Sequence, residues 1–211
     1  MPRKPAHEQF DTLKAIEDRA FELFGRYGYE GVSIGDIAKA ARLSKGALYW
    51  HFQGKEELYL HCLKRLHGLF DHYIFEPMRA EPDALKSILR VFTGLRELLQ
   101  DTRVQKGIAG YWLIPSTSGT SALTGTQRDF EAASVAALRV VLERASSQGQ
   151  LDLGNDLDDM APAMISLVEA CALPLRHMDS GEVQRILSVL ARSLFKAYAK
   201  SEDALALARL I

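Results

Sequence analysis

The sequence predicts an all-α protein, with a small N-terminal helical domain followed by a larger helical bundle. Nearly every segment with a clear hydrophobic period repeats its apolar residues every three or four positions, as helices do. No segment alternates apolar and polar residues in the manner of a half-buried strand. The chain has 211 residues, of which 47% are hydrophobic, so it can form one large domain or two small ones. We expect a first domain over residues 1–54 and a second over residues 55–211.

Apolar stripes and capping residues mark the N-terminal helices. The first helix ends at Gly28, and its inward stripe is Leu13, Ile16, Ala20, Phe24 and Tyr27. Ser33 is placed to cap a short helix over residues 34–41, with Asp36 completing a capping box. Ser44 is placed to cap a third helix over residues 45–52. A longer helix, from residue 55 to about residue 76, then leads into the second domain.

The second domain continues the helical pattern. Pro77 and Pro82 mark a break after the long helix. Further helices are expected over residues 83–100, 103–113, 127–148, 156–177 and 181–200. Residues 115–126, PSTSGTSALTGT, indicate a loop rich in Gly, Ser and Thr.

The two short helices over residues 34–41 and 45–52 fit a helix-turn-helix, joined by the turn at residues 42–44. In that motif the second helix enters the DNA major groove. Leu48 and Phe52 lie four residues apart and therefore face the core, whereas the rings between them point elsewhere. Trp50 either covers the junction with the long helix or lies against the DNA backbone.

Charge and small side chains support the DNA interface. Residues 33–55 contain four cations, Lys39, Arg42, Lys45 and Lys55, against one anion, Asp36. Lysines, hydroxyls and imidazoles suit phosphate oxygens, small residues allow close approach, and an alanine methyl can contact a thymine methyl. The candidate DNA-binding residues are Ser33, Arg42, Ser44, Lys45, Gly46, Ala47, Tyr49, His51 and Lys55.

The stretch FELFGRYGYEGVSIGDIAKAARLSKGALYWHFQGKEELY resembles the N-terminal domain of TetR/AcrR-type transcriptional repressors, with a match from about residue 10 to residue 66. The resemblance implies about nine helices, a C-terminal domain that binds a small effector, and a homodimer formed through the last two helices. The family usually has Gly where this chain has Arg42. Either the turn differs there, or Arg42 accepts a left-handed backbone and offers a cation near the DNA.

The second domain offers weaker signals. An effector pocket among its helices should be mostly apolar and suit an apolar or amphipathic molecule. Its candidate residues are Phe92, Tyr111, Trp112, Met164, Val168 and Cys171. Each of them also fits a plain core, which is the commoner role of aromatic and Met residues at helical spacing. Glu169, set among apolar neighbours, either faces solvent or anchors a polar group of the ligand.

Other function classes find less support. Cys62 and Cys171 lie far apart, and no metal-ligand spacing, acid/base pair or nucleophile elbow is present, so we expect no metal, no cofactor and no enzyme activity. No 18-residue apolar run or signal peptide occurs, which favours a cytoplasmic protein that does not enter the membrane. The sequence thus predicts a repressor released from a palindromic double-stranded DNA operator by a small effector. A helical enzyme with an unrecognised site, or a DNA-binding regulator without an effector, remain the alternatives.

Overall fold

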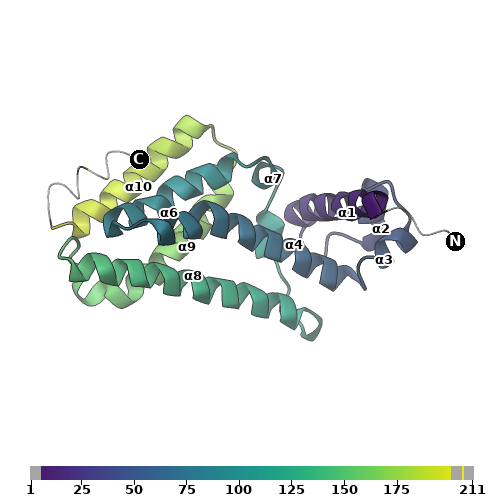
Figure 1. Ribbon diagram of the computed structural model, residues 1–211, viewed down its shortest axis with the longest axis horizontal. Helices are drawn as coiled ribbons and strands as arrows, with labels where there is room; N and C mark the ends of the chain where they lie inside the picture. Colours follow the sequence, from purple (N-terminus) through teal and green to yellow (C-terminus); the bar gives the residue numbers. More distant parts are fainter. Residues whose placement is uncertain (1–5, 201–205, 207–211) are drawn as a thin grey trace. The chain divides into compact units, whose positions relative to one another are not determined.

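The computed structural model describes residues 6–200 and residue 206, and it confirms the all-α architecture. Ten α-helices are present in this part of the chain, together with short 3₁₀ turns and one π-helical turn (Figure 1). The β-structure found there is a single isolated bridge between Leu151 and Ala199. The chain divides into two compact units. The first contains Met1–Leu66 and Lys106–Arg128, and the second contains His67–Gln105 and Asp129–Ile211.

The first unit begins with three helices, α1 (Ala6–Tyr27), α2 (Ile34–Ala40) and α3 (Lys45–Tyr49). α1 stops because Gly28 adopts a positive φ of 73° and donates its N–H to the carbonyl of Phe24 at 2.9 Å. Tyr27 was expected on the inward stripe, but its side chain is 60% exposed. It occupies the last turn of α1, where the reversal at Gly28 leaves it facing solvent.

Apolar side chains from these helices share one core. Four of these side chains are fully buried: Ile16 and Phe24 of α1, Ile37 of α2 and Leu48 of α3. Helix α2 packs against both α1 and α3. Phe52, beyond the end of α3, is 6% exposed and completes the inward pair with Leu48. The inward positions of the helix-turn-helix are therefore those that the sequence predicts. Each such side chain contributes about 1.5–3 kcal/mol by its burial.

A distant segment of the chain also packs into the first unit. Residues 103–113 were expected to form one helix; instead α7 (Thr102–Gln105) ends early and a 3₁₀ turn, η2 (Ala109–Trp112), packs against α1. Gly107 interrupts the helix with a φ of 131°. The hydroxyl of Tyr111 donates to the carbonyl of Phe21 at 3.0 Å. Gly110 lies so close to α1 that an added Cβ would sit 2.1 Å from the carbonyl oxygen of Phe24.

The long connecting helix does not run unbroken to residue 76. α4 (Lys55–Phe70) is followed by a π-helical turn, η1 (Asp71–Phe75), and then by α5 (Glu76–Ala80). In the π turn the N–H of Glu76 donates to the carbonyl of Asp71, five residues back. Gly94 of α6 (Ala84–Gln100) packs directly on this turn, since a Cβ there would lie 2.2 Å from the carbonyl oxygen of Tyr73.

In the second unit, α6 packs against both α9 (Leu157–Leu175) and α10 (Ser180–Tyr198). α8 (Ser121–Ser147) begins six residues earlier than the expected residue 127, inside the predicted loop. The start lies there because Thr117 and Thr120 form a capping box at the preceding 3₁₀ turn. α9 continues through Pro162 and Pro174.

A polar cluster joins the end of α6 to α7. The carboxylate of Asp101 accepts hydrogen bonds from the Arg103 guanidinium, at 2.9 Å from its Nε, and from the Tyr73 hydroxyl at 3.0 Å. The side chain of Asp101 is 7% exposed. The hydrogen bond from Arg103 lowers the pKa of this carboxyl from 3.8 to about 2.

We expect Asp101→Asn to lower the free energy of unfolding at pH 7 by about 1–3 kcal/mol, because Arg103 loses its charged partner. The folded-state pKa is depressed, so the contribution is complete above pH 3.8 and is lost as pH falls toward 2. Urea unfolding from pH 7 to pH 2 measures this. The difference between wild type and variant should shrink over that acid range, and a difference independent of pH would contradict the assignment.

Candidate nucleic-acid interface

Two serines fix the starts of the helix-turn-helix elements. The Ser33 hydroxyl accepts the N–H of Asp36 at 3.2 Å, and the Asp36 carboxylate accepts the Ser33 N–H at 2.9 Å. This is the predicted capping box, and the hydrogen bonds from Ser33 lower the pKa of Asp36. The Ser44 hydroxyl accepts the N–H of Ala47 at 3.1 Å and caps α3 in the same way. Both hydroxyls therefore have a structural role, because they fix the N-terminal ends of α2 and α3.

An open groove of about 490 Å³ runs beside these helix starts, and we call it the α2–α3 groove. Its lining consists of residues 30–36, Lys45, Tyr49 and Lys55. Four of the predicted DNA-binding residues, Ser33 among them, therefore border one feature of the surface. Glu30 and Asp36 also line the groove, so the two lysines face it together with two acids.

Lys45 lies along the first turn of α2. A Cβ placed on Gly35 would be 3.0 Å from its Cε and 3.3 Å from its Nζ. The absence of a side chain at Gly35 thus makes room for the lysine. The ammonium of Lys45 also adds to the lowering of the Asp36 pKa, after the larger effect of the Ser33 hydrogen bonds. Lys45 is exposed and holds its charge over the N-terminal end of α2.

Lys55 is held by the ring of Tyr29, a residue outside the predicted DNA-binding set. Its Nζ lies 4.2 Å from the centroid of the Tyr29 ring, a cation–π contact. Tyr29 in turn packs edge-on against Tyr59, with ring centroids 5.1 Å apart. Tyr59 is fully buried and its hydroxyl donates to the Gly110 carbonyl at 3.3 Å. A chain of contacts therefore leads from the η2 segment to a cation at the edge of the groove.

The aromatic run at residues 49–52 separates as expected. Tyr49 is 54% exposed and lines the groove, whereas Phe52 is buried. Trp50 is 66% exposed, which does not fit a cover over the junction with α4. The ring of His51 meets Trp50 edge-on at 5.0 Å and is half-buried. Gly46 is exposed and Ala47 half-buried, at the first turn of α3.

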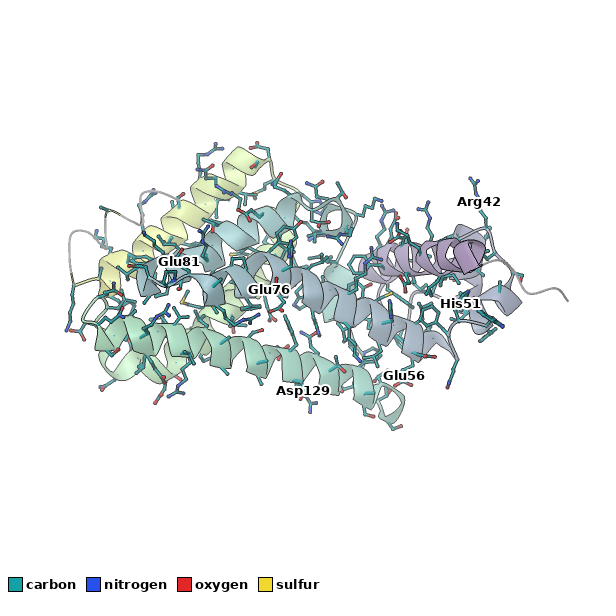
Figure 2. All side chains as sticks on the ribbon, viewed as in Figure 1. Arg42, His51, Glu56, Glu76, Glu81 and Asp129 are labelled. Carbon is teal, nitrogen blue, oxygen red and sulfur yellow. The ribbon has the colours of Figure 1, made fainter. Side chains whose placement is uncertain are left out.

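Arg42 occupies the turn between α2 and α3 with a φ of 57°, in the left-handed region. Of the two alternatives, the backbone strain is therefore the one observed. Figure 2 shows the Arg42 side chain extending outward from the helices of the first unit, and the residue is exposed. Arg42 does not line the α2–α3 groove, and neither do Ser44, Gly46, Ala47 and His51.

Arg42→Gly should stabilise the fold by about 1 kcal/mol, because glycine adopts the left-handed region without the steric cost of a Cβ. If Arg42 also places its cation near DNA, the same change should weaken DNA binding while the protein becomes more stable. Chemical unfolding and DNA titration of the one variant measure both effects. Arg42→Ala is the control that removes the charge but keeps the strain. A variant that is no more stable than wild type would contradict the strain assignment.

The candidate effector residues belong to two different units of the structure. Phe92, Met164, Val168 and Cys171 line a narrow apolar cavity in the second unit, with a volume of about 10 Å³. That volume holds at most one water molecule. Tyr111 and Trp112 belong to the η2 turn of the first unit and do not line this cavity. Tyr111 is 1% exposed within an aromatic cluster with Phe21 and Tyr59.

Glu169 also belongs to the second unit, on α9. Its side chain is half-buried, and desolvation raises the pKa of its carboxyl, with a smaller contribution from the charge of Glu131. It does not line the narrow cavity.

The described residues contain no group of His, Cys, Asp and Glu able to hold a metal ion. Their helices include none that is long and apolar enough to cross a membrane.

The sequence of the N-terminal helices matches known proteins. A family model described as "Bacterial regulatory proteins, tetR family" matches residues 16–62, from α1 into α4. The AcrR HTH-type transcriptional regulator of Shigella flexneri is 44% identical over 59 residues. Residues 16–62 of the chain are therefore similar to the tetR family of bacterial regulatory proteins. The match to AcrR covers 28% of this chain and spans 27% of that regulator's length.

Solved structures share the fold of nearly the whole chain. A gamma-butyrolactone receptor described as ArpA-like has a TM-score of 0.72 and 21% identity, over 95% of this chain and 96% of the receptor. A cysteine mutant of the TetR-family regulator CifR, complexed with 26-bp double-strand operator DNA, has a TM-score of 0.67 and 16% identity. That likeness covers 89% of this chain and 95% of CifR. At these identities the likeness establishes the fold of the helical second unit.

Proposed function

We propose that the protein is a DNA-binding transcriptional regulator, a repressor that a small-molecule effector releases from its operator. The observation that carries this proposal is the α2–α3 groove, where Lys45, Tyr49 and Lys55 gather beside a capped helix-turn-helix. The match of residues 16–62 to the tetR family model and the solved operator complex of CifR, which shares this fold, support the same function. In this proposal α3 enters the major groove, and Gly46 and Ala47 let its first turn approach the bases.

In this proposal the side chains around the groove make different contacts with the DNA. Lys55, steadied by the Tyr29 ring, contacts a phosphate, and Tyr49 and His51 contact the backbone through hydroxyl and imidazole. Lys45 lies at the start of α3 and contributes to sequence preference as well as to charge. Ser33 and Ser44 act first as helix caps. Arg42 adds a cation from the strained turn.

The second unit is proposed to bind the effector and to form the homodimer. The dimer contact is placed on α9 and α10, where Val189 is 52% exposed and Leu167, Leu190 and Leu194 are half-buried. Two copies related by a two-fold axis present two α3 helices to a palindromic site. The solved structure of a gamma-butyrolactone receptor supports a small-molecule effector for this fold. A regulator of this kind acts in the cytoplasm, where Cys62 and Cys171 stay reduced, as both are free here.

Lys55→Ala tests the phosphate contact. An operator recovered from random double-stranded DNA should bind the variant more weakly, and the reduction should be similar for unrelated DNA. The slope of log affinity against log salt should flatten by about 1 for each phosphate that the variant no longer neutralises, because fewer counterions are released. Lys64→Ala is the matched control: Lys64 is exposed on the same helix and does not line the groove. A changed base preference with an unchanged salt slope would refute the assignment.

A regulator without a small effector is the second candidate, because the predicted apolar cavity is narrow. A thermal-shift screen separates the two, since a ligand that binds the native state raises the melting temperature.

A further inference from the structure

The second unit also contains a cavity that is larger than the narrow cavity at Phe92 and that none of the predicted pocket residues lines. It has a volume of about 280 Å³ and lies between the end of α4, the π turn η1, α5 and α8. We call it the π-turn cavity, and its lining includes His67, Gly68, Asp71, Phe75, Arg79 and Phe130. Small-molecule sites usually enclose about 300–1,000 Å³, so this volume suits a compact ligand.

Two departures from regular helix structure border this cavity. The π turn over Asp71–Phe75 interrupts the helix, and such turns are frequent at functional sites. Gly68 lies inside α4, where glycine is less stable than alanine, and a Cβ added to it would meet no atom within 4 Å. The π turn and Gly68 thus each lower the stability of the helix beside the π-turn cavity. That combination is expected where a ligand, rather than the core, determines the residues.

The walls are flat and aromatic. The rings of His67 and Phe130 stack face to face, with centroids 4.0 Å apart and planes 6° from parallel. Phe75 meets Phe130 edge-on at 6.0 Å. Ser134 is buried, and its hydroxyl donates to the carbonyl of Phe130, one turn back on α8. Rings of this kind favour a planar aromatic ligand, which can stack on a face or meet an edge.

The polar part of the lining is a charge pair. Arg79 Nη2 lies 2.6 Å from Asp71 Oδ1, and the two side chains are 48% and 40% exposed. One bond leaves a guanidinium with further N–H donors and a carboxylate with further acceptor sites. Because the pair carries no net charge, an anionic ligand gains attraction from Arg79 but is repelled by Asp71, and a cationic ligand meets the reverse. A neutral hydroxyl avoids both repulsions, because it donates to the carboxylate and accepts from the guanidinium.

We propose that the π-turn cavity binds a compact planar aromatic molecule that carries an uncharged hydroxyl group. In naming this class as the effector, the inference rests on the proposed function. The ligand's rings lie against Phe75 and the His67–Phe130 stack, and its hydroxyl reaches the Asp71–Arg79 pair. The narrow cavity at Phe92 then belongs to the core.

Fluorescence titration with 2-naphthol at pH 8 tests the site, with the full-length protein and no DNA present. Gly68→Leu fills the cavity and should weaken 2-naphthol binding at least tenfold. Gly125→Leu is the matched control, because Gly125 also lies inside a helix with open space at its Cβ and does not line the cavity. Gly68→Ala should raise the melting temperature by about 1–4 °C and still weaken binding measurably. Equal affinity of wild type and both Gly68 variants would overturn the site.

The ligand class has its own test. Naphthalene, 2-naphthoate and 2-naphthylmethylammonium should each bind wild type at least threefold more weakly than 2-naphthol. Asp71→Asn should shift the preference toward 2-naphthoate, and Arg79→Gln toward the ammonium compound, each by up to about fivefold, as expected for a half-exposed charge pair. Naphthalene binding as tightly as 2-naphthol would overturn the hydroxyl assignment.

The link to regulation is measured separately. Saturating 2-naphthol should lower the affinity of wild type for its recovered operator at least fivefold and leave Gly68→Leu unaffected. Binding of 2-naphthol without any change in DNA affinity would overturn the effector assignment. A protein that recovers no operator from random DNA would instead refute the proposed function, while the 2-naphthol titrations would still decide whether the π-turn cavity is a ligand site.

Discussion

Gly110→Ala should lower the free energy of unfolding of the first unit by about 3 kcal/mol. The added methyl carbon would lie 2.1 Å from the Phe24 carbonyl oxygen and 2.5 Å from the Gly28 nitrogen, both of them backbone atoms. The η2 turn must therefore move away from α1, which is the cost of overpacking. That movement also weakens the buried hydrogen bonds from the Tyr59 hydroxyl to Gly110 and from the Tyr111 hydroxyl to Phe21.

Urea unfolding followed by circular dichroism measures this destabilisation. Gly119→Ala is the control, because a Cβ at Gly119 would meet nothing closer than the Thr117 hydroxyl at 3.9 Å. Its free energy of unfolding should change by less than about 1 kcal/mol. If Gly110→Ala were as stable as Gly119→Ala, the η2 segment would not be docked on α1 as described.

Lys45→Glu should reduce operator affinity at least about 100-fold at low salt. A hydrogen bond to a charged group contributes about 1.5–3 kcal/mol, and in a homodimer the substitution removes one such bond at each half-site. The new carboxylate also faces the phosphates with a like charge. The fold should tolerate the change, since an acid in the first turn of α3 interacts favourably with the helix dipole.

Lys39→Glu provides the matched comparison. Lys39 is an exposed lysine in the last turn of α2 and does not line the α2–α3 groove. It carries the same charge reversal only a few residues away, so it separates the local interaction from the net charge. Comparable reductions of affinity in the two variants, measured by fluorescence anisotropy, would mean that the groove has no special role.

Local rules predicted the helix-turn-helix well. Ser33 and Ser44 precede their helices by one residue and cap them, and the spacing of Leu48 and Phe52 places both in the core. These features depend on neighbours within four residues, which a single sequence displays. The prediction that Tyr27 faces the core was wrong, because its exposure depends on the reversal of the chain after α1.

Features set by distant contacts were not predictable in the same way. The π turn after α4 coincides with the close approach of Gly94 on α6, about twenty residues later in the chain. The η2 turn belongs to the first unit because Gly110 and Tyr111 pack against α1. Neither glycine carries a local signal that distinguishes close packing from an ordinary loop.

The structure brings together some of the residues predicted for each candidate site. A capped pair of short helices fixes which residues share a face, so Ser33, Lys45, Tyr49 and Lys55 border one groove. Tyr29 was missed because its role depends on the position of Lys55 in space, with no helical spacing to reveal it. In the second unit, apolar residues at helical spacing fit a core and a cavity equally well.

The central claim, that the α2–α3 groove and α3 bind operator DNA, is tested most directly by selection of bound sequences from a random double-stranded library. The full-length protein should enrich an inverted repeat whose half-site centres lie about 34–36 Å apart, one helical turn, or a multiple of that distance. The same selection with Lys45→Glu should enrich no sequence. Recovery of no common sequence by wild type, or of the same repeat by Lys45→Glu, would contradict the claim.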